Sequence, residues 1–183
     1  MILSRFRNVG EEVVYRGSLI SVAQGVFADP AGGEFRRDVV HHPGAVSVVP
    51  VIDGGASALL VRQYRAAVDR ELLEIPAGKR DVEGEPVEVT ARRELEEEIG
   101  MRAGRLEQLA EFYNSPGFCD EHSFVFMARD LEPCTSSAQG IEEQHMSVER
   151  VSLDDVHALI ADGTLIDAKS IIGLLLAINA LAG

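Results

Sequence analysis

Cysteine is scarce in this chain of 183 residues. Its two cysteines, Cys119 and Cys134, are too few for a disulfide framework, which favours a reducing, intracellular environment. The first residues include no apolar segment of the length of a signal peptide. The longest apolar run, residues 171–178, is far too short to span a bilayer. These absences predict a cytoplasmic protein without a membrane partner.

Basic residues are also few. The 17 lysines and arginines stand against 30 aspartates and glutamates, so the formal net charge is −13. No basic surplus exists to meet the phosphates of a nucleic acid, which argues against a general nucleic-acid binder. An acidic protein that acts on smaller anionic phosphates would have to recruit metal ions and a few well-placed arginines. The length suits one domain with a substantial core.

The stretch from Leu72 to Met101 is the most informative part of the sequence. An apolar run ends at Pro76-Ala77-Gly78 and a polar loop follows. Pro86 is expected as the first residue of a helix, because its missing N–H would have no partner there. Gly100 is expected just past the C-terminus of that helix. Apolar residues recur every four positions along it and predict one stripe that faces a core: Val87, Ala91, Leu95 and Ile99.

A second face of this helix carries Glu94, Glu97 and Glu98, which lie three or four residues apart. Like charges at this spacing destabilise an isolated helix by roughly 0.2–0.5 kcal/mol per pair, and glutamates near a C-terminus oppose the helix dipole. Two interpretations fit the spacing. The face is either a solvated acidic surface or a site for a hard divalent cation such as Mg²⁺, which joins a few carboxylates to substrate phosphates.

This stretch resembles the Nudix box, a loop–helix–loop with a glycine, a spaced glutamate and the pattern Arg-Glu-apolar-x-Glu-Glu-x-Gly-apolar. The matching residues are Gly78, Glu85, Arg93-Glu94-Leu95, Glu97-Glu98 and Gly100-Met101. Six residues, rather than the usual five, separate Gly78 from Glu85. The extra residue precedes the helix and leaves its register intact, but it puts the role of Glu85 in question. The resemblance favours the metal interpretation.

Segments on both sides of the box resemble ADP-ribose pyrophosphatases. They are His42–Val46, Val61–Arg65, Glu74–Gly78, Ser115–Gly117 and Gly163–Ser170. The resemblance covers most of the chain from about Arg37 onward. It implies Mg²⁺-dependent hydrolysis of the diphosphate of ADP-ribose to AMP and ribose 5-phosphate, with Mn²⁺ as a possible substitute. The alternatives are another nucleoside diphosphate sugar or a dinucleotide as substrate, or a non-catalytic Nudix module that senses ADP-ribose or NAD metabolites.

The same resemblance implies roles for individual residues. The metal would be held by two carboxylates and one backbone carbonyl, those of Glu94, Glu98 and Ala77. The general base would be Glu142, on a loop outside the box, with its neighbour Glu143 as the alternative. Arg93 would orient the box carboxylates, and Glu97 is a further candidate catalytic residue of the box.

The resemblance also suggests substrate contacts from Arg65 and from an N-terminal β arm that carries Arg37 and Asp38. Residues 1–42 form this arm in the predicted division of the chain, and residues 43–183 form the Nudix domain. The arm has too few large apolar residues for a core of its own, and an isolated hairpin is marginal in water. ADP-ribose pyrophosphatases that resemble this chain are homodimers that exchange such an arm, so a homodimer is expected.

Alternating and continuous apolar patterns predict strands at residues 12–16, 18–27, 34–42, 45–52, 58–64, 71–75, 106–113, 123–128 and 146–151. Helices are expected at residues 86–99, 152–161 and 168–181. Residues 130–145 lack periodicity and are expected as a surface loop. The fold class is therefore α+β: the Nudix α/β/α sandwich, a mixed central sheet with helices on both sides, plus the N-terminal antiparallel β arm.

Overall fold

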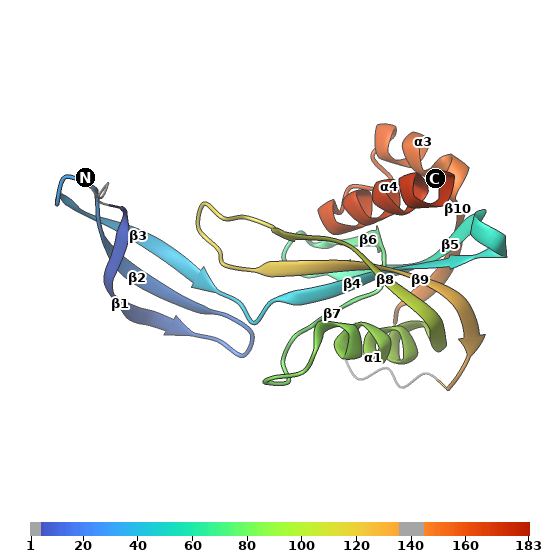
Figure 1. Ribbon diagram of the computed structural model, residues 1–183, viewed down its shortest axis with the longest axis horizontal. Helices are drawn as coiled ribbons and strands as arrows, with labels where there is room; N and C mark the ends of the chain where they lie inside the picture. Colours follow the sequence, from blue (N-terminus) through green and yellow to red (C-terminus); the bar gives the residue numbers. More distant parts are fainter. Residues whose placement is uncertain (1–4, 136–144) are drawn as a thin grey trace. The chain divides into compact units, whose positions relative to one another are not determined.

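The computed structural model describes residues 5–135 and 145–183, and the chain forms two compact units. The arm unit comprises Met1–Gly44 together with Phe112–His122. The main unit comprises Ala45–Glu111 and Ser123–Gly183. In Figure 1 the strands of the arm unit are blue, and the helices that cover the main sheet are green and red.

The arm unit is a three-stranded antiparallel sheet in the order β1 (Arg7–Arg16), β2 (Ser21–Ala28) and β3 (Glu34–His41). The turn between β2 and β3 is held by Asp29, whose carboxylate accepts the N–H groups of Ala31 and Gly33 at 2.7 and 2.9 Å. Gly32 lies in this turn at a φ of 90°, where a side chain would be strained. The turn appears where the sequence predicts it, whereas β2 begins at Ser21 rather than at residue 18, and β3 ends one residue early, at His41.

The main unit contains a mixed sheet in the order β10-β5-β4-β9-β8, with β6 paired to β5 and β7 paired to β4. Its strands are β4 (Ala45–Ile52), β5 (Ser57–Arg65), β6 (Arg70–Glu74), β7 (Ala77–Lys79), β8 (Met101–Tyr113), β9 (His122–Pro133) and β10 (Ser147–Ser152). Strand β4 runs parallel to β9 and antiparallel to β5 and β7. Its six inner residues are buried, as a strand covered on both faces requires.

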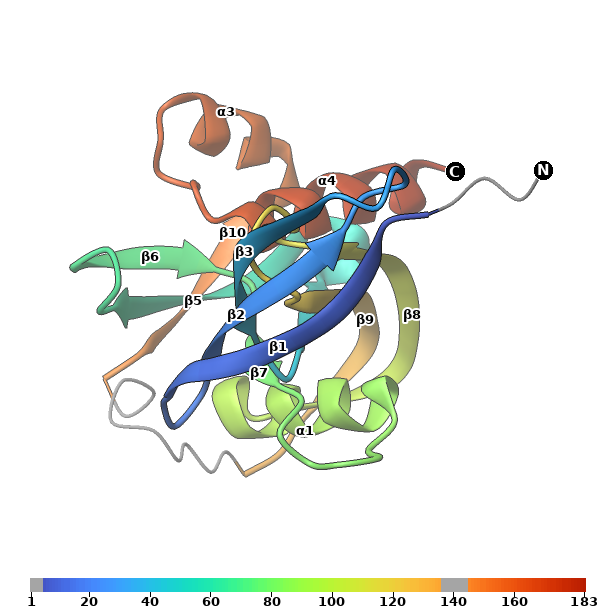
Figure 2. The same ribbon diagram turned by 90° about the vertical axis from the view of Figure 1, so that its left-hand side faces the viewer.

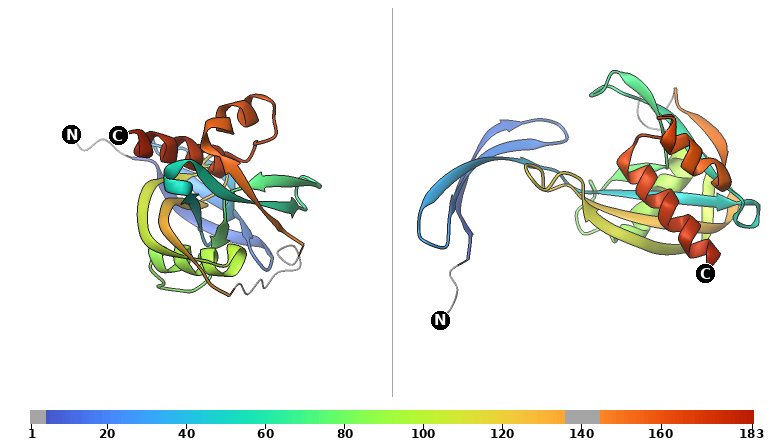
Figure 3. Two further views of the ribbon diagram at one scale, coloured as in Figure 1. Left: turned by 90° about the vertical axis from the view of Figure 1, so that its right-hand side faces the viewer. Right: turned by 90° about the horizontal axis from the view of Figure 1, so that it is seen from above.

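Helix α1 (Val87–Ile99) covers one face of this sheet, and α3 (Val156–Ala161) and α4 (Ala168–Ala182) cover the other (Figures 1, 2 and 3). Because successive strand residues alternate between faces, Val46 and Val48 of β4 join the core under α1. Val49 points to the opposite face, where Gly173 of α4 comes so close that an added Cβ would lie 3.1 Å from it. The predicted α/β/α arrangement is confirmed.

The ends of the helices follow the sequence with two corrections. The helix expected over residues 152–161 begins with a 3-10 turn, Leu153–Asp155, and is α-helical only from Val156. Gly100 is left-handed at φ 63° and ψ 37° and caps α1. Pro86 is not the first helical residue: it is the extended N-cap, at φ −60° and ψ 142°, and Val87 begins the helix. Asp167 caps α4 by accepting the N–H of Ser170 at 3.0 Å. Along α1 the predicted stripe is inward, with Ala91 and Leu95 fully buried.

The expectation of a loop over residues 130–145 is wrong at its start, because β9 continues to Pro133. Strand β8 is its hydrogen-bonded neighbour, and charge pairs connect the two strands here. Arg105 lies 3.0 Å from Asp130, and Arg129 lies 3.3 Å from Glu107. The extension holds one apolar residue that packs on the core, Leu131, between two charged residues, and so short an alternation does not mark a strand in the sequence. Within residues 5–135 and 145–183, every helix is too short or too polar to cross a bilayer.

Candidate active site

The close approach of β7 to α1 forms the centre of the candidate site. Gly78 of β7 pairs with Val46 of β4 and faces the side chain of Glu94. A Cβ at position 78 would lie 1.8 Å from Cδ of Glu94, far inside van der Waals contact. Glycine is therefore required here for space, and its absent side chain provides the room in which the carboxylate lies.

Glu98 follows Glu94 by one helical turn and contacts the same strand. Its Oε2 accepts the N–H of Ala77 at 3.0 Å. Both glutamates are buried, with residue exposures of 7% for Glu94 and 8% for Glu98. The solvated acidic face considered from the sequence is thus wrong for these two carboxylates. The structure brings together the three residues predicted to hold a metal: Ala77, Glu94 and Glu98.

Arg93 lies within reach of several carboxylates around this centre. Its Nη1 is 2.8 Å from Oε1 of Glu94 and 3.2 Å from Oε2 of Glu97. Its Nη2 is 3.4 Å from Oε2 of Glu85 and 3.6 Å from Oδ1 of Asp81. Burial lowers the pKa of Arg93, but the neighbouring carboxylates, Glu94 foremost, outweigh it and raise the pKa. One guanidinium therefore holds four negative groups together.

The longer loop before the helix still delivers Glu85 to the site. Its Oε2 accepts a hydrogen bond from the Thr90 hydroxyl at 2.7 Å as well as pairing with Arg93. Thr90 is fully buried one turn into α1. The extra residue is absorbed within the loop, at residues 80–84, before Glu85 reaches this position.

The donors at this centre fit a hard divalent cation. Among residues 5–135 and 145–183, no three His, Cys, Asp or Glu side chains form a closed cage. Two buried carboxylates beside a backbone segment provide an open set instead, which Mg²⁺ commonly completes with water and substrate phosphate. The cluster has more negative than positive charge around Arg93, and a divalent cation would offset that excess. Glu94, Glu98 and Ala77 are the residues that would hold it.

Arg65 lies at the end of β5 and pairs with Glu74 of β6. Its Nε and Nη2 donate to the two oxygens of Glu74 at 2.7 and 2.6 Å, which is a bidentate pair. The Glu74 side chain is only 1% exposed, whereas that of Arg65 is 39% exposed. Sequence reasoning did not assign a role to Glu74 or to its second partner Lys169. Both stand in segments that carried the family resemblance, which was the available signal.

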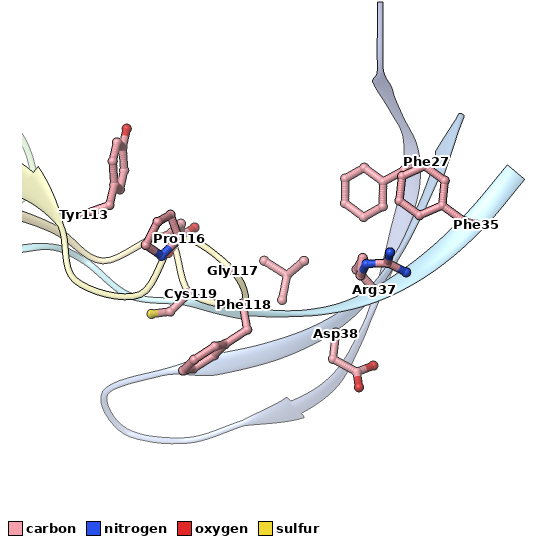
Figure 4. A pocket seen from close by; sticks show the side chains of 11 residues that line it. Phe27, Phe35, Arg37, Asp38, Tyr113, Pro116, Gly117, Phe118 and Cys119 are labelled. Atoms are coloured by element: carbon pink, nitrogen blue, oxygen red, sulfur yellow. The ribbon is translucent and has the colours of Figure 1, made fainter. Parts of the chain in front are cut away.

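The two other predicted substrate contacts, Arg37 and Asp38, lie on β3 in the arm unit. They line a hollow of about 400 Å³ within that unit (Figure 4). The guanidinium of Arg37 stands over the ring of Phe35 at 4.8 Å, and Phe35 stacks on Phe27 at 5.7 Å. The remaining walls come from Val39 and from the segment 113–120. An arginine beside aromatic faces is suited to stacking on a base or a sugar.

Residues 136–144 are outside the described part of the chain, and they include the predicted base Glu142 and its alternative Glu143. Glu97 lies at the site through its pair with Arg93. The roles of all these residues remain predictions at this point.

Comparison with known proteins places the chain in a family. The model of the NUDIX domain matches residues 41–172, which is most of the chain, and the chain belongs to the Nudix family of hydrolases. Members that act as ADP-ribose pyrophosphatases generally use divalent metal ions, in agreement with the donors at Glu94 and Glu98.

Curated relatives match nearly the whole chain. An ADP-ribose pyrophosphatase of Bacillus subtilis is 37% identical over 164 residues, covering 90% of this chain and 88% of the relative. One of Mycobacterium tuberculosis is 33% identical over 170 residues, covering 93% and 82%. A methanol dehydrogenase activator of Bacillus methanolicus is 32% identical over 168 residues, covering 92% and 90%. A crystal structure of an ADP compounds hydrolase shares the fold, with a TM-score of 0.86 at 24% identity, covering 100% of this chain and 97% of the other.

Proposed function

We propose that this Nudix enzyme hydrolyses the diphosphate of ADP-ribose to AMP and ribose 5-phosphate, with Mg²⁺ as the metal and Mn²⁺ as a substitute. The observation that carries the proposal is the buried pair Glu94 and Glu98 against the backbone at Ala77 and Gly78. Relatives named as ADP-ribose pyrophosphatases support the choice of substrate.

The reaction breaks one P–O bond of the diphosphate: the oxygen of the attacking water bonds to one phosphorus, the departing phosphate takes the electron pair of the broken bond, and the proton of the water reaches that phosphate through the general base. A bound divalent cation supplies charge neutralisation for the diphosphate and polarises water. Arg93 holds the box carboxylates in place. Arg65 presents a partly exposed guanidinium to the anionic diphosphate. Glu142 accepts the proton of the water as general base.

The test is turnover of ADP-ribose with and without Mg²⁺, together with ADP-glucose, GDP-mannose, NADH and diadenosine polyphosphates. ADP-ribose should give the highest kcat/KM, and removal of the metal with a chelator should abolish turnover. Glu98→Gln keeps the size of the side chain but removes its charge, and should reduce turnover by orders of magnitude in a folded protein. Absence of turnover with every substrate, alongside measurable ADP-ribose binding, would instead favour the sensing module.

We further propose that the protein is a homodimer in which residues 1–42 serve as an exchanged arm and residues 43–183 as the Nudix domain. The described part of the arm exposes large apolar side chains, among them Phe6 at 67%, Val14 at 61% and Tyr15 at 58%. Exposed large apolar side chains are suited to an interface.

Subunit mixing tests the exchange of the arm. Arg37→Ala and Glu98→Gln homodimers should each be poor enzymes, since each lacks a group that both sites need. A mixed dimer would contain one site with both residues intact and should regain up to about half of the activity per dimer. A monomer in sedimentation, or no recovery after verified exchange, would show that the arm serves its own chain.

A further inference from the structure

Glu74 is a buried carboxylate at the end of β6 with two cationic partners. Arg65 donates two hydrogen bonds to it, and Nζ of Lys169 donates to Oε2. Burial by itself would raise the pKa of Glu74, but the hydrogen bonds from Arg65 and the charge of Lys169 outweigh burial and lower it. Glu74 is therefore ionised in the folded protein.

Lys169 lies in the first turn of α4 and fixes this turn to β6. Its Nζ also lies 2.9 Å from Oδ2 of Asp167, the N-cap of the helix. The next residue, Ser170, accepts the N–H of Ile75 at 2.8 Å through its hydroxyl. Two consecutive residues of α4 thus hold Glu74, the last residue of β6, and Ile75, the residue just beyond it.

The chain from Glu74 onward leads directly to the candidate metal site. The carbonyl of Pro76 accepts the N–H of Val48 at 2.9 Å, and Ala77 donates its N–H to Glu98 at 3.0 Å. Every residue from 74 to 77 is therefore held by a hydrogen bond or ion pair. This series of contacts connects Lys169 and Ser170, at the start of α4, to the carboxylate of Glu98.

Arg65 belongs to the buried network and also interacts electrostatically with Glu98 of the candidate site. Its pKa is raised, first by the hydrogen bond to Glu74, and also by the charges of Glu74, Asp167 and Glu98, although burial opposes them. The guanidinium is thus within electrostatic range of a carboxylate predicted to hold the metal. The bonds to Glu74 use Nε and Nη2, and the side chain is 39% exposed, so part of the fork can meet a ligand.

We propose that Glu74 and Lys169 are positioning residues for Arg65. Glu74 orients the guanidinium through the bidentate pair. Lys169 supplies the second positive charge, without which Arg65 alone would have to neutralise a buried carboxylate and would attract an anionic diphosphate less strongly. The inference rests on the proposed function, in which Arg65 contacts the diphosphate.

The first test compares Lys169→Met with Lys169→Arg. If the lost positive charge acts over about 8 Å at an effective dielectric constant of about 20–40, KM should rise by about 5- to 30-fold. The kcat should stay within about threefold, because the lost attraction acts on bound substrate and transition state alike. Lys169→Arg keeps the charge and should keep KM. Arg150→Met is the control, since it removes one cation from an exposed pair with Asp53.

The second test repeats Lys169→Met in an Arg65→Ala background. If Lys169 acts through Arg65, its effect on KM should disappear there, as a double-mutant cycle would report. A merely structural role would lower the unfolding midpoint and the active fraction at unchanged KM. Unchanged KM in Lys169→Met, or an equal rise of KM with and without Arg65, would overturn the proposal.

If Lys169→Met fails to fold, the double variant Glu74→Gln/Lys169→Met replaces it. This variant removes both charges of the Glu74–Lys169 pair, so neither is left buried without its partner. This double variant also removes the anchor of Arg65 and must raise KM if the proposal holds. A wild-type protein without ADP-ribose turnover would refute the proposed function alone. The positioning role is then decided by the Kd of inorganic diphosphate in the presence of Mg²⁺: binding must weaken in Lys169→Met, and only when Arg65 is present.

Discussion

Substitution of Gly78 by alanine gives the sharpest test of the site geometry. The added Cβ would lie 1.8 Å from Cδ of Glu94 and 2.1 and 2.2 Å from its two oxygens. Ordinary contact begins near 3.4 Å, so the carboxylate must retreat by about 1.5 Å, whereas a Mg²⁺–oxygen bond tolerates only about 0.2 Å. A misplacement of about 1 Å can reduce catalysis by about 10²-fold, and we expect at least that loss of kcat/KM.

The fold should tolerate this change, because the clash involves the end of a flexible side chain and not the backbone of β7. The unfolding midpoint should stay close to that of the wild type, or rise slightly as alanine restricts the unfolded chain. The assay is ADP-ribose turnover over a range of Mg²⁺ concentrations, with metal binding followed by calorimetry. Gly10→Ala is the matched control, since nothing lies within 4 Å of its added Cβ. Wild-type turnover and metal affinity in Gly78→Ala would refute the placement of the metal at Glu94.

Three other outcomes follow from the chain. Glu142→Gln should lower kcat by about 10²–10⁴-fold at nearly constant KM, and Glu143→Gln is the control. If steady-state or stopped-flow kinetics show the loss in Glu143→Gln instead, Glu143 is the general base. The pKa of Glu74 lies below its ordinary value of 4.5, so the ionised carboxylate contributes its full stability above pH 4.5 and loses it as the pH falls through the lower, folded pKa. In Glu74→Gln, the urea midpoint should therefore fall less steeply than in the wild type between pH 5 and pH 3, roughly the range in which carboxylates titrate. Gly173→Ala places a Cβ within 3.1 Å of three core side chains and should destabilise the protein by about 1–3 kcal/mol, measured by urea unfolding, without a change in KM.

Local patterns were sufficient to predict much of this structure. Helix α1 could be predicted from its apolar stripe and from Gly100, because both signals lie within the helix or directly after it in the sequence. Strand β4 is buried on both faces, and its continuous β-branched run predicts this directly. Pro86 was misplaced by one position, because proline is compatible with both the cap and the first turn. The end of β9 was missed because it holds a single apolar residue, Leu131, among charged residues and ends at Pro133.

Contacts between distant residues could not be read from local patterns. Lys169 and Glu74 are 95 residues apart in the chain. No rule of residue spacing predicts a contact between the start of a helix and the end of a strand at this separation. The need for Gly78 was indicated by the resemblance, but its physical reason, the room for the Glu94 carboxylate, depends on how α1 packs against β7. Family resemblance marked these segments, and only the packing shows what they do.

Because basic residues are few in this chain, the cations at the site, Arg65, Arg93 and Lys169, matter more than they would in a basic protein. A protein with a net charge of −13 offers little general attraction to an anionic diphosphate, and screening confines surface charges to about 8 Å at physiological ionic strength. Attraction must then come from nearby groups: a divalent cation between the buried glutamates, and a guanidinium that is not fully neutralised by its own anchor. Arg93 is committed to the carboxylates of the box. In the proposed arrangement, Arg65 remains available to substrate because Lys169 shares the charge of Glu74.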